Sequence, residues 1–318
     1  MTQSRAVIAP VPAGEPRPQW SVMIPAYECG AFLGDTLRSV LAQDPGPEAM
    51  QIEVVDDASS EDLEIVVRTV GEGRVHYHRH PKNVGHIANF ACCLNRSRGE
   101  IVHLLHGDDL VLPGFYKALG KGFDDPAIGA AFCRWQEIDS AGSVTAVADE
   151  EQPIPGPLED AIGRLASEQR IVTPAIAVRR SVWEQLGGFD PRLQCAEDWE
   201  MWVRIAAHHG IWYEPAVLAA YRKHEQSNSG RHFTNARELH YTLQAMSLFR
   251  PLLPKGRADT ILAGARRAYA QTALGNAKRL ARERRRPAMW AHLRMAWRLW
   301  PRLATLREAS RIAWRTER

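Results

Sequence analysis

The chain has 318 residues, of which 45% are hydrophobic and 24% are charged. This composition is typical of a globular protein and excludes a chain that is mainly disordered. Its longest apolar runs fall far short of the roughly 18 residues that a membrane-spanning helix needs, so no transmembrane helix is expected.

Charge is distributed unequally along the chain. The formal net charge is +3, but residues 250–318 hold 18 lysine and arginine residues against four acidic ones. The preceding part is therefore acidic. A basic tail of this kind binds anionic lipid, nucleic acid or an acidic partner, and charge alone does not choose between them.

Residues 1–18 are rich in proline and lack an unbroken apolar stretch, so they are expected to form a flexible lead-in and not a signal peptide. A cytoplasmic protein is therefore expected. The cysteines are odd in number and include no CxxC pair, which argues against a disulfide framework and against a structural zinc site. We expect reduced, buried thiols at Cys29, Cys92, Cys93, Cys133 and Cys195.

From Trp20 to about residue 120, short β-branched runs alternate with amphipathic segments. The predicted strands are Ser21–Ile24, Ile52–Val55, Val75–His78 and Ile101–Leu105. The predicted helices are Phe32–Gln43, Ile65–Val70, Gly85–Leu94 and one with Pro113 in its first turn. This βαβ spacing predicts an α/β fold with a mainly parallel sheet and helices on both faces.

The second half is less regular. Strands are predicted at Ala130–Trp135, Ser143–Val147 and Ile171–Val178, and helices at Ser181–Leu186 and Asp198–His208. The pattern is almost entirely helical after Phe233. We expect a lead-in (1–18), a catalytic domain (19–232, with a nucleotide-binding half at 19–125 and an acceptor half at 126–232) and a basic helical extension (233–318).

Polar residues follow the predicted strands directly. Ligands of parallel sheets bind beyond the carboxyl ends of the strands. Carboxylates held close together are costly unless a cation neutralises them, and Mg²⁺ or Mn²⁺ suits such oxygen ligands. Helix capping and turn formation are the alternative roles. The residues concerned are Tyr27 and Glu28 after the first strand, Asp56 and Asp57 after the second, and His106, Asp108 and Asp109 after the fourth.

Several ordered sequence blocks together resemble glycosyltransferase family 2, the inverting sugar-nucleotide-dependent enzymes of the GT-A fold. The resemblance covers residues 21–229. The blocks are Ser21–Glu28, Glu53–Ser59, Lys82–Gly85 with Asn89, Gly99–Glu100, His106–Asp109 with Pro113–Gly114, Gly187–Asp190, Glu197–Trp199 and Tyr221–His224.

The resemblance implies a nucleotide pocket at the first three blocks. Asp57 is expected to hydrogen-bond the base, and Tyr27 offers a flat face for stacking. The segment with Lys82 passes near the ribose and phosphates. The implied nucleotide-binding residues are Pro25, Ala26, Tyr27, Glu28, Asp57, Lys82, Gly85 and Asn89.

The resemblance also implies a metal site for Mn²⁺ or Mg²⁺. His106–Asp108 matches the family's Asp-X-Asp motif, but its first acid is histidine here. Asp108 is therefore the main expected ligand, with His106 and His224 as further candidates. Asp109 is expected to orient the donor sugar or a coordinated water.

Glu197 and Asp198 resemble the family's acidic pair, whose second member is the general base. An attacking alcohol must lose its proton, which a carboxylate within reach accepts. Asp198 is therefore the expected catalytic residue, with helix capping as the alternative. Glu197 is expected on the acceptor side, and Trp199 either forms an apolar wall under the acceptor sugar or belongs to the core.

The sequence thus predicts an inverting glycosyltransferase that uses a UDP, dTDP or GDP sugar and a saccharide or lipid-linked acceptor in cell-envelope, polysaccharide or other glycoconjugate synthesis. A catalytically silent sugar-nucleotide or glycan-binding protein on the same fold is the alternative. A nucleotidyltransferase is disfavoured, because the glycine-rich phosphate loop expected near the first strand is absent from the sequence.

Residues 287–318 combine tryptophans with arginines at helical spacing. Trp290, Leu293, Trp297 and Trp300 recur at three- and four-residue steps. This composition is typical of a helix at a membrane interface, which predicts peripheral contact at the inner face of the membrane. The alternative is that the tryptophans pack on the catalytic domain. Nucleic-acid binding is not expected, because the tail has no recognised motif and the body is acidic.

Overall fold

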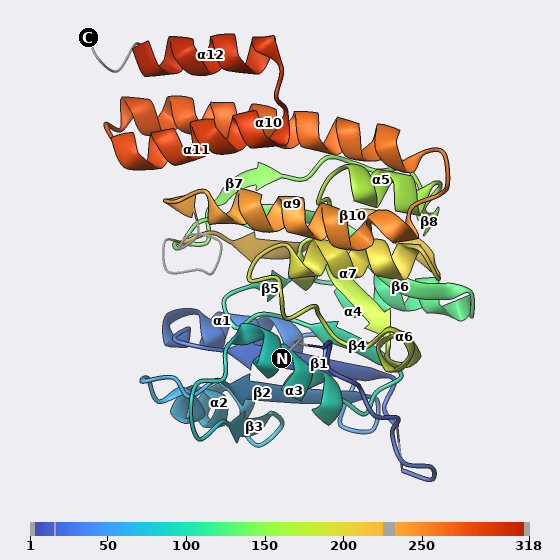
Figure 1. Ribbon diagram of the computed structural model, residues 1–318. Coiled ribbons are helices and arrows are strands. Elements are labelled where there is room, and N and C mark those ends of the chain that lie inside the picture. Colours follow the sequence, from blue (N-terminus) through green and yellow to red (C-terminus); the bar gives the residue numbers. More distant parts are fainter. Residues whose placement is uncertain (1–3, 16, 225–232, 315–318) are drawn as a thin grey trace. The chain divides into compact units, whose positions relative to one another are not determined.

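A computed structural model describes residues 4–15, 17–224 and 233–314. The chain divides into two compact units. Unit 1 consists of residues 1–161, 170–192 and 204–223, and unit 2 of residues 162–169, 193–203 and 224–318. Unit 1 contains the sheet, and unit 2 contains the long carboxy-terminal helices (Figure 1).

Unit 1 is organised around a ten-stranded sheet. The strand order is β3-β2-β1-β4-β9-β6-β10-β5, with β7 paired to β6 and β8 paired to β10. The strands are β1 (Trp20–Ala26), β2 (Met50–Asp56), β3 (His76–Arg79), β4 (Ile101–Leu104), β5 (Leu110–Val111), β6 (Ile128–Ile138), β7 (Val144–Val147), β8 (Gly156–Pro157), β9 (Ile176–Arg179) and β10 (Gly210–Arg222).

Strands β3, β2, β1 and β4 are all parallel, and every residue of β1 and β2 is buried. Such burial is expected where helices cover both faces of a sheet. The predicted α/β fold is therefore confirmed, with its parallel part in this half. The other half is mixed, because β9 runs antiparallel to both β4 and β6.

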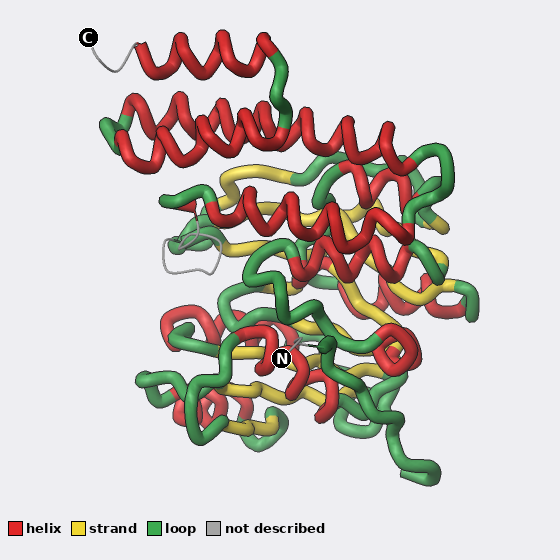
Figure 2. The backbone as a smooth tube through the Cα atoms, in the orientation of Figure 1, coloured by secondary structure: helices red, strands yellow, loops and turns green. Residues whose placement is uncertain are grey.

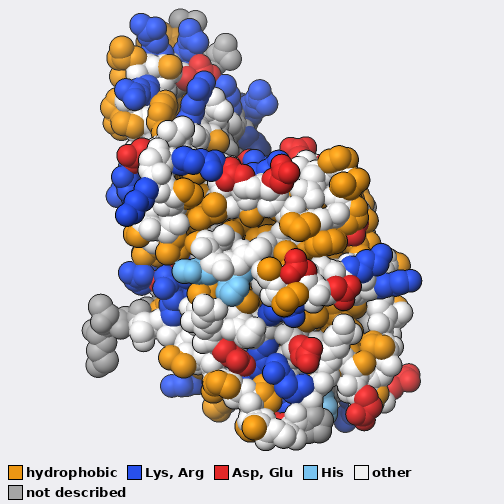
Figure 3. Space-filling model, turned by 90° about the vertical axis from the view of Figure 1, so that its right-hand side faces the viewer, with side chains coloured by type: hydrophobic (Ala, Val, Ile, Leu, Met, Phe, Trp, Pro, Cys, Tyr) orange, Lys and Arg blue, Asp and Glu red, His pale blue; other side chains and the backbone are white. Residues whose placement is uncertain are grey.

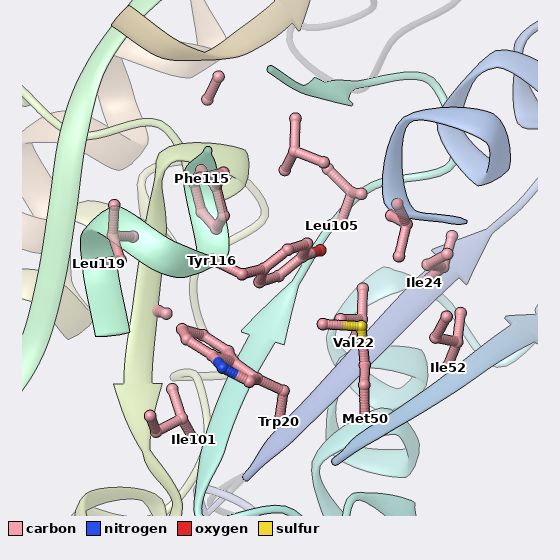
Figure 4. Packing of buried hydrophobic residues seen from close by; sticks show 14 of the residues in the cluster. Trp20, Val22, Ile24, Met50, Ile52, Ile101, Leu105, Phe115, Tyr116 and Leu119 are labelled. Atoms are coloured by element: carbon pink, nitrogen blue, oxygen red, sulfur yellow. The ribbon is translucent and has the colours of Figure 1, made fainter. Parts of the chain in front are cut away.

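Helices supply the apolar layers of unit 1. They are α1 (Gly30–Leu41), α2 (Leu63–Gly71), α3 (His86–Arg96), α4 (Phe115–Gly120) and α6 (Arg180–Leu186), with 3₁₀ turns at Lys121–Asp124 and Thr173–Ala175. Figure 4 shows the core around β1, where Trp20 meets Tyr116 of α4 edge-on at a centroid distance of 5.1 Å. Val22 and Ile24 lie beside Met50 and Ile52 of β2.

Two local predictions differ from the structure, and one strand was not predicted. Residues Thr173–Ala175 form a 3₁₀ turn, so only the end of the predicted strand Ile171–Val178 pairs in the sheet; Pro174 has no N–H to donate. Helix α4 begins at Phe115 and not at Pro113, because Gly114 between them adopts φ 95°. Strand β10 was not predicted, since Pro215 interrupts its pattern and falls at a register shift.

Part of the predicted lead-in packs on the rest of unit 1. Ile8 is buried, and the carbonyl of Ala9 accepts a hydrogen bond from the buried guanidinium of Arg180 at 2.7 Å. Arg5 forms an ion pair with Asp190 at 3.1 Å. These contacts join residues 5–9 to unit 1, although their composition indicated flexibility.

Unit 2 is helical, as the sequence predicted for the basic extension. Its elements are α9 (Arg237–Phe249), a 3₁₀ turn (Arg250–Leu252), α10 (Ala258–Arg282), α11 (Arg286–Leu299) and α12 (Leu303–Trp314), together with most of α5 (Ala161–Ser167) and α7 (Glu197–Ala206). Helices α10 and α11 lie side by side (Figure 2). Within the described ranges, no helix is long and apolar enough to cross a membrane.

Candidate active site

The residues after β1 form a turn that exposes a single aromatic ring. Pro25 and Ala26 are buried at the end of the strand, whereas Tyr27 is 44% exposed. Glu28 has a positive φ of 49°, and its carboxylate accepts hydrogen bonds from the Ser60 amide at 2.7 Å and the Ser60 hydroxyl at 2.9 Å. Glu28 therefore fastens this turn to the loop after β2 and leaves the Tyr27 ring open to a ligand.

Asp57 organises the loop before α3. Its two carboxylate oxygens accept hydrogen bonds from the backbone amides of Val84 at 2.7 Å and Gly85 at 2.9 Å. Its carbonyl accepts a further bond from Asn83 at 3.1 Å. Because a carboxylate offers about four lone-pair sites, Asp57 keeps acceptor capacity for a further donor. The side chain of Lys82 in this loop is exposed.

Asn89 is a buried link between α3 and the sheet. Its amide nitrogen donates to the carbonyl of Val55 in β2 at 3.0 Å, and its amide oxygen lies 3.2 Å from Nε2 of His80 after β3. Asn89 was predicted to bind the nucleotide, and its side chain positions α3. This helix begins directly after Gly85, which has a φ of 85°.

Two of the predicted metal ligands, His106 and Asp108, lie close together after β4, next to Asp109, which was predicted to orient the donor sugar or a coordinated water. Ligand atoms of His106, Asp108 and Asp109 all lie within 4.8 Å of one another. Asp109 is fully buried, and its Oδ2 has no hydrogen-bond partner among the described residues; it lies 3.6 Å from Nδ1 of His106. Burial, reinforced by the charge of Asp108, raises the pKa of Asp109 well above its usual range. A divalent cation would offset both the burial of the Asp109 charge and its repulsion by Asp108. This donor set therefore fits Mn²⁺ or Mg²⁺.

The His106 ring has a fixed place in this cluster. It stacks on Phe90 of α3 with centroids 5.3 Å apart and an interplanar angle of 10°. The histidine that replaces the family's first acid is therefore oriented by packing against the same helix that follows the Lys82–Gly85 loop.

Arg222, at the end of β10, holds the acidic loop in place and was not singled out from the sequence. Its backbone amide donates to Oδ1 of Asp109 at 2.8 Å, and its Nε donates to the carbonyl of Asp108 at 2.9 Å. The guanidinium also donates to the carbonyl of Asp139 at 3.1 Å and lies over the ring of Phe32 at 4.7 Å. Its position in the Tyr221–His224 block was the available signal.

His224 itself belongs to unit 2, so the structure does not assign it to the acidic cluster of unit 1. The acidic pair Glu197 and Asp198 also lies in unit 2, at the start of α7. Burial, and next the charge of Glu197, raises the pKa of Asp198 to about 7. Oδ2 of Asp198 accepts a hydrogen bond from Gln169 at 2.8 Å. Asp198 therefore titrates near neutral pH, in the range that suits a general base.

Trp199 is almost completely buried within unit 2. Its indole N–H donates to the carbonyl of Leu165 at 2.6 Å, and its rings contact Phe249 and Tyr269 at centroid distances of 5.0 and 5.4 Å. The sequence left two roles for Trp199, an apolar wall under the acceptor sugar or a place in the core. With 1% of its surface exposed, Trp199 lies in the core.

Comparison with known sequences identifies the family. The model of glycosyl transferase family 2 matches residues 21–187, which is more than half of the chain. The chain belongs to glycosyltransferase family 2. It is therefore a glycosyltransferase, as the ordered blocks predicted.

The relatives are of mixed description. The chain is 30% identical over 217 residues to an uncharacterized protein of Mycobacterium tuberculosis, covering 65% of this chain and 67% of that protein. It is 34% identical over 124 residues to an N-acetylglucosaminyltransferase of Mesorhizobium japonicum, covering 38% and 29% of the two chains. It is 28% identical over 229 residues to the succinoglycan biosynthesis protein ExoU of Rhizobium meliloti, covering 67% and 64%.

Two solved structures share the fold of this chain. TarS 1–349 of S. aureus in complex with UDP-GlcNAc matches with a TM-score of 0.64 at 18% identity, covering 78% of this chain and 71% of that TarS chain. The mannosyltransferase PcManGT of Pyrobaculum calidifontis in complex with GDP-Man and Mn²⁺ matches with a TM-score of 0.59 at 20% identity, covering 98% and 83%. These similarities confirm the predicted GT-A fold.

Replacing Arg222 should destabilise unit 1. We expect Arg222→Met to lower the free energy of unfolding by about 3 kcal/mol, because it removes a positive charge that favours the ionised form of the buried Asp109 and leaves backbone carbonyls without their donor. Urea denaturation measures the change. The adjacent Lys223→Met is the matched control: the side chain of Lys223 is 62% exposed where it pairs with Glu137, so its loss should cost less than about 1 kcal/mol. Equal effects of the two substitutions would contradict this role of Arg222.

Proposed function

We propose that this glycosyltransferase moves a sugar from a nucleoside-diphosphate sugar to an acceptor hydroxyl with inversion of the anomeric carbon. The observation that carries the proposal is the alignment of three polar loops in unit 1. They follow the neighbouring parallel strands β2, β1 and β4 at their carboxyl ends. Open α/β sheets bind ligands at this edge.

The nucleotide would bind at the loops after β1 and β2. The exposed ring of Tyr27 can stack on a base, and Asp57 can accept a ring N–H with its remaining lone pairs. Lys82 and the amino-terminal end of α3 favour the negative charge of a diphosphate. UDP and GDP are the first candidates, because UDP-GlcNAc and GDP-Man are the ligands named for TarS and PcManGT. dTDP is the third nucleotide to be compared with them.

The acidic cluster would hold the metal. We assign Asp108 as the main ligand of Mn²⁺ or Mg²⁺, with Asp109 and His106 beside it and His224 as a further candidate. A bound divalent ion supplies positive charge that stabilises a departing diphosphate. PcManGT, for which Mn²⁺ is named, is the similar structure that supports a metal.

Asp198 would act as the general base. The acceptor oxygen forms the new bond to the anomeric carbon while the bond to the diphosphate breaks, and the hydroxyl proton passes to the Asp198 carboxylate. One displacement of this kind inverts the configuration. Glu197 is assigned to the acceptor side, where its charge helps to keep the pKa of Asp198 high. Family membership favours this enzyme over a silent binding protein.

The acceptor is proposed to be a saccharide or a lipid-linked glycan in polysaccharide, cell-envelope or other glycoconjugate synthesis. The similarity to the succinoglycan biosynthesis protein supports a polysaccharide pathway.

Helix α11 carries a surface suited to an anionic membrane. Trp290 and Trp297 are 45% and 44% exposed, and the exposed Arg294 lies between them at helical spacing. The third aromatic position of the pattern, Trp300, instead packs against a small core within unit 2. Figure 3 shows basic and hydrophobic side chains mixed on the surface of the helical region at the top of the view. We propose that the surface formed by Trp290, Arg294 and Trp297 lies on anionic lipid.

Nucleotide binding tests the donor site. In isothermal titrations with UDP, dTDP and GDP, with and without Mn²⁺, we expect one nucleotide to bind in a metal-dependent manner. Asp108→Ala should abolish that dependence on Mn²⁺, because it removes the main metal ligand. His224→Ala tests whether His224 is a further metal ligand. The matched control is Asp124→Ala, which changes an exposed carboxylate of the same unit. Failure of the folded protein to bind any of the three would overturn the assignments of Asp57 and Asp108.

Asp198→Asn should lower kcat by about 10²–10⁴-fold, because the amide cannot accept the acceptor proton. Nucleotide binding should stay unchanged. Since the base must be ionised, the activity of the unaltered enzyme should fall as the pH drops below about 7. The rate of sugar transfer to water or to an added acceptor, measured as a function of pH, tests for this loss of activity at low pH. An Asp198→Asn enzyme with full kcat would rule out this base.

Vesicle sedimentation tests the membrane surface. We expect the protein to bind vesicles that contain phosphatidylglycerol and to dissociate as salt rises, because screening weakens exposed charges. Replacing both Trp290 and Trp297 with alanine should reduce binding. Replacing the exposed Ile65 and Val144 of unit 1 with alanine is the control and should have no effect. No binding of the unaltered protein, or equal loss in both double variants, would contradict the proposal.

A further inference from the structure

Unit 1 contains a second cluster of potential metal ligands, built on the edge strand of the sheet. His78 lies in β3 and His80 directly after it, two residues apart and therefore on one face of the strand. Cys92 belongs to α3. One ligand atom from each of the three residues lies within 4.8 Å of the other two.

The chemistry of this donor set differs from that of the acidic cluster. Two imidazole nitrogens and a thiolate sulfur suit Zn²⁺, whereas Mg²⁺ and Mn²⁺ prefer oxygen. Bond lengths in tetrahedral zinc sites imply ligand-to-ligand separations of roughly 3.3–3.6 Å, so small side-chain rotations would bring these atoms into position. Three protein ligands leave the fourth position of zinc to water.

The hydrogen bonds around the cluster suit ligation. Nε2 of His80 lies 3.2 Å from the amide oxygen of Asn89, a contact that orients the ring; in the tautomer with its proton on Nε2, this nitrogen donates to Asn89 and the Nδ1 lone pair is available to a metal. Metal-bound histidines commonly use their second nitrogen in this way. Asn89 itself is fixed by its bond to the carbonyl of Val55.

The charges around the cluster are compatible with a cation. Burial, and next the charge of Arg96, lowers the pKa of His78, so its imidazole is neutral at neutral pH. Arg96 is paired with the carboxylate of Glu53, which moderates its repulsion of a cation. Burial raises the pKa of the Cys92 thiol, but zinc displaces the proton of a coordinating thiol.

We propose that His78, His80 and Cys92 bind Zn²⁺, or a similar thiophilic divalent ion, and thereby fasten β3 to α3. All five thiols were expected to be buried; the structure confirms this for four of them, whereas Cys92 is only partly buried. The absence of a CxxC pair argued against a structural zinc site, but these ligands are brought together by the strand and the helix. This site does not depend on the proposed sugar transfer.

Cobalt spectroscopy of the untagged protein tests the site. Co²⁺ should produce the visible bands of tetrahedral coordination and a thiolate-to-cobalt charge-transfer band, and Zn²⁺ should remove both. Cys92→Ser should abolish the charge-transfer band. Competition with a chromogenic chelator measures the affinity for zinc. His78→Ala and Cys92→Ser should each weaken it by at least about 10–100-fold, because that is the typical loss when a residue that only hydrogen-bonds a metal ligand is replaced. Zinc should also raise the thermal midpoint of the unaltered protein.

His76→Ala is the matched control, because His76 is an exposed histidine of the same strand outside the cluster. It should leave zinc affinity unchanged. Circular dichroism without metal verifies that each variant is folded. The proposal would be overturned by a folded protein that gives no charge-transfer band, or by a band that survives Cys92→Ser. A band lost in Cys29→Ser instead would also overturn it, since Cys29 lies near Asp108.

Discussion

The arrangement of the candidate donor site depends on Arg222. Its backbone amide and its guanidinium bind the loop of Asp108 and Asp109, which lies more than a hundred residues earlier in the chain. The Asp109 carboxylate is buried, and an isolated charge there would be very costly. Arg222 supplies both a donor and a countercharge, and the charge lowers the pKa that burial raises. The strand that carries Arg222 therefore maintains the acidic cluster in a form that a cation can complete.

Acidic residues hold the loops that are proposed to bind the nucleotide. Glu28 accepts hydrogen bonds from Ser60, and Asp57 accepts them from the backbone of Val84 and Gly85. Loops need such partners because their backbone groups lack the regular bonding of helices and strands. Glu28 and Asp57, which the family resemblance assigned to nucleotide contact, thus also hold these loops together. The side chains of Tyr27 and Lys82, in contrast, are exposed.

The outward position of two tryptophans follows from the packing of the long helices. Small residues occupy many buried positions of α10 and α11, including Ala270, Ala273 and Ala277 in α10 and Ala288 and Ala296 in α11. Small side chains allow two helices to approach closely, which leaves no room for an indole between them. Trp290 and Trp297 therefore face away from this contact and contribute apolar surface beside arginine.

The sequence by itself determined the α/β class, the family and the edge of the sheet at which Tyr27, Asp57 and Asp108 lie. These features follow from local periodicity and from the order of short blocks, which are written in consecutive residues. The tertiary structure alone decided that Arg222 supports the acidic loop, that Trp199 is internal to unit 2, and that His78 and Cys92 are neighbours. Each depends on which distant segments pack together, and periodicity identifies a buried face without identifying what covers it. Strand β10 was missed for a local reason, since Pro215 interrupts its pattern and only pairing with β6 makes it a strand.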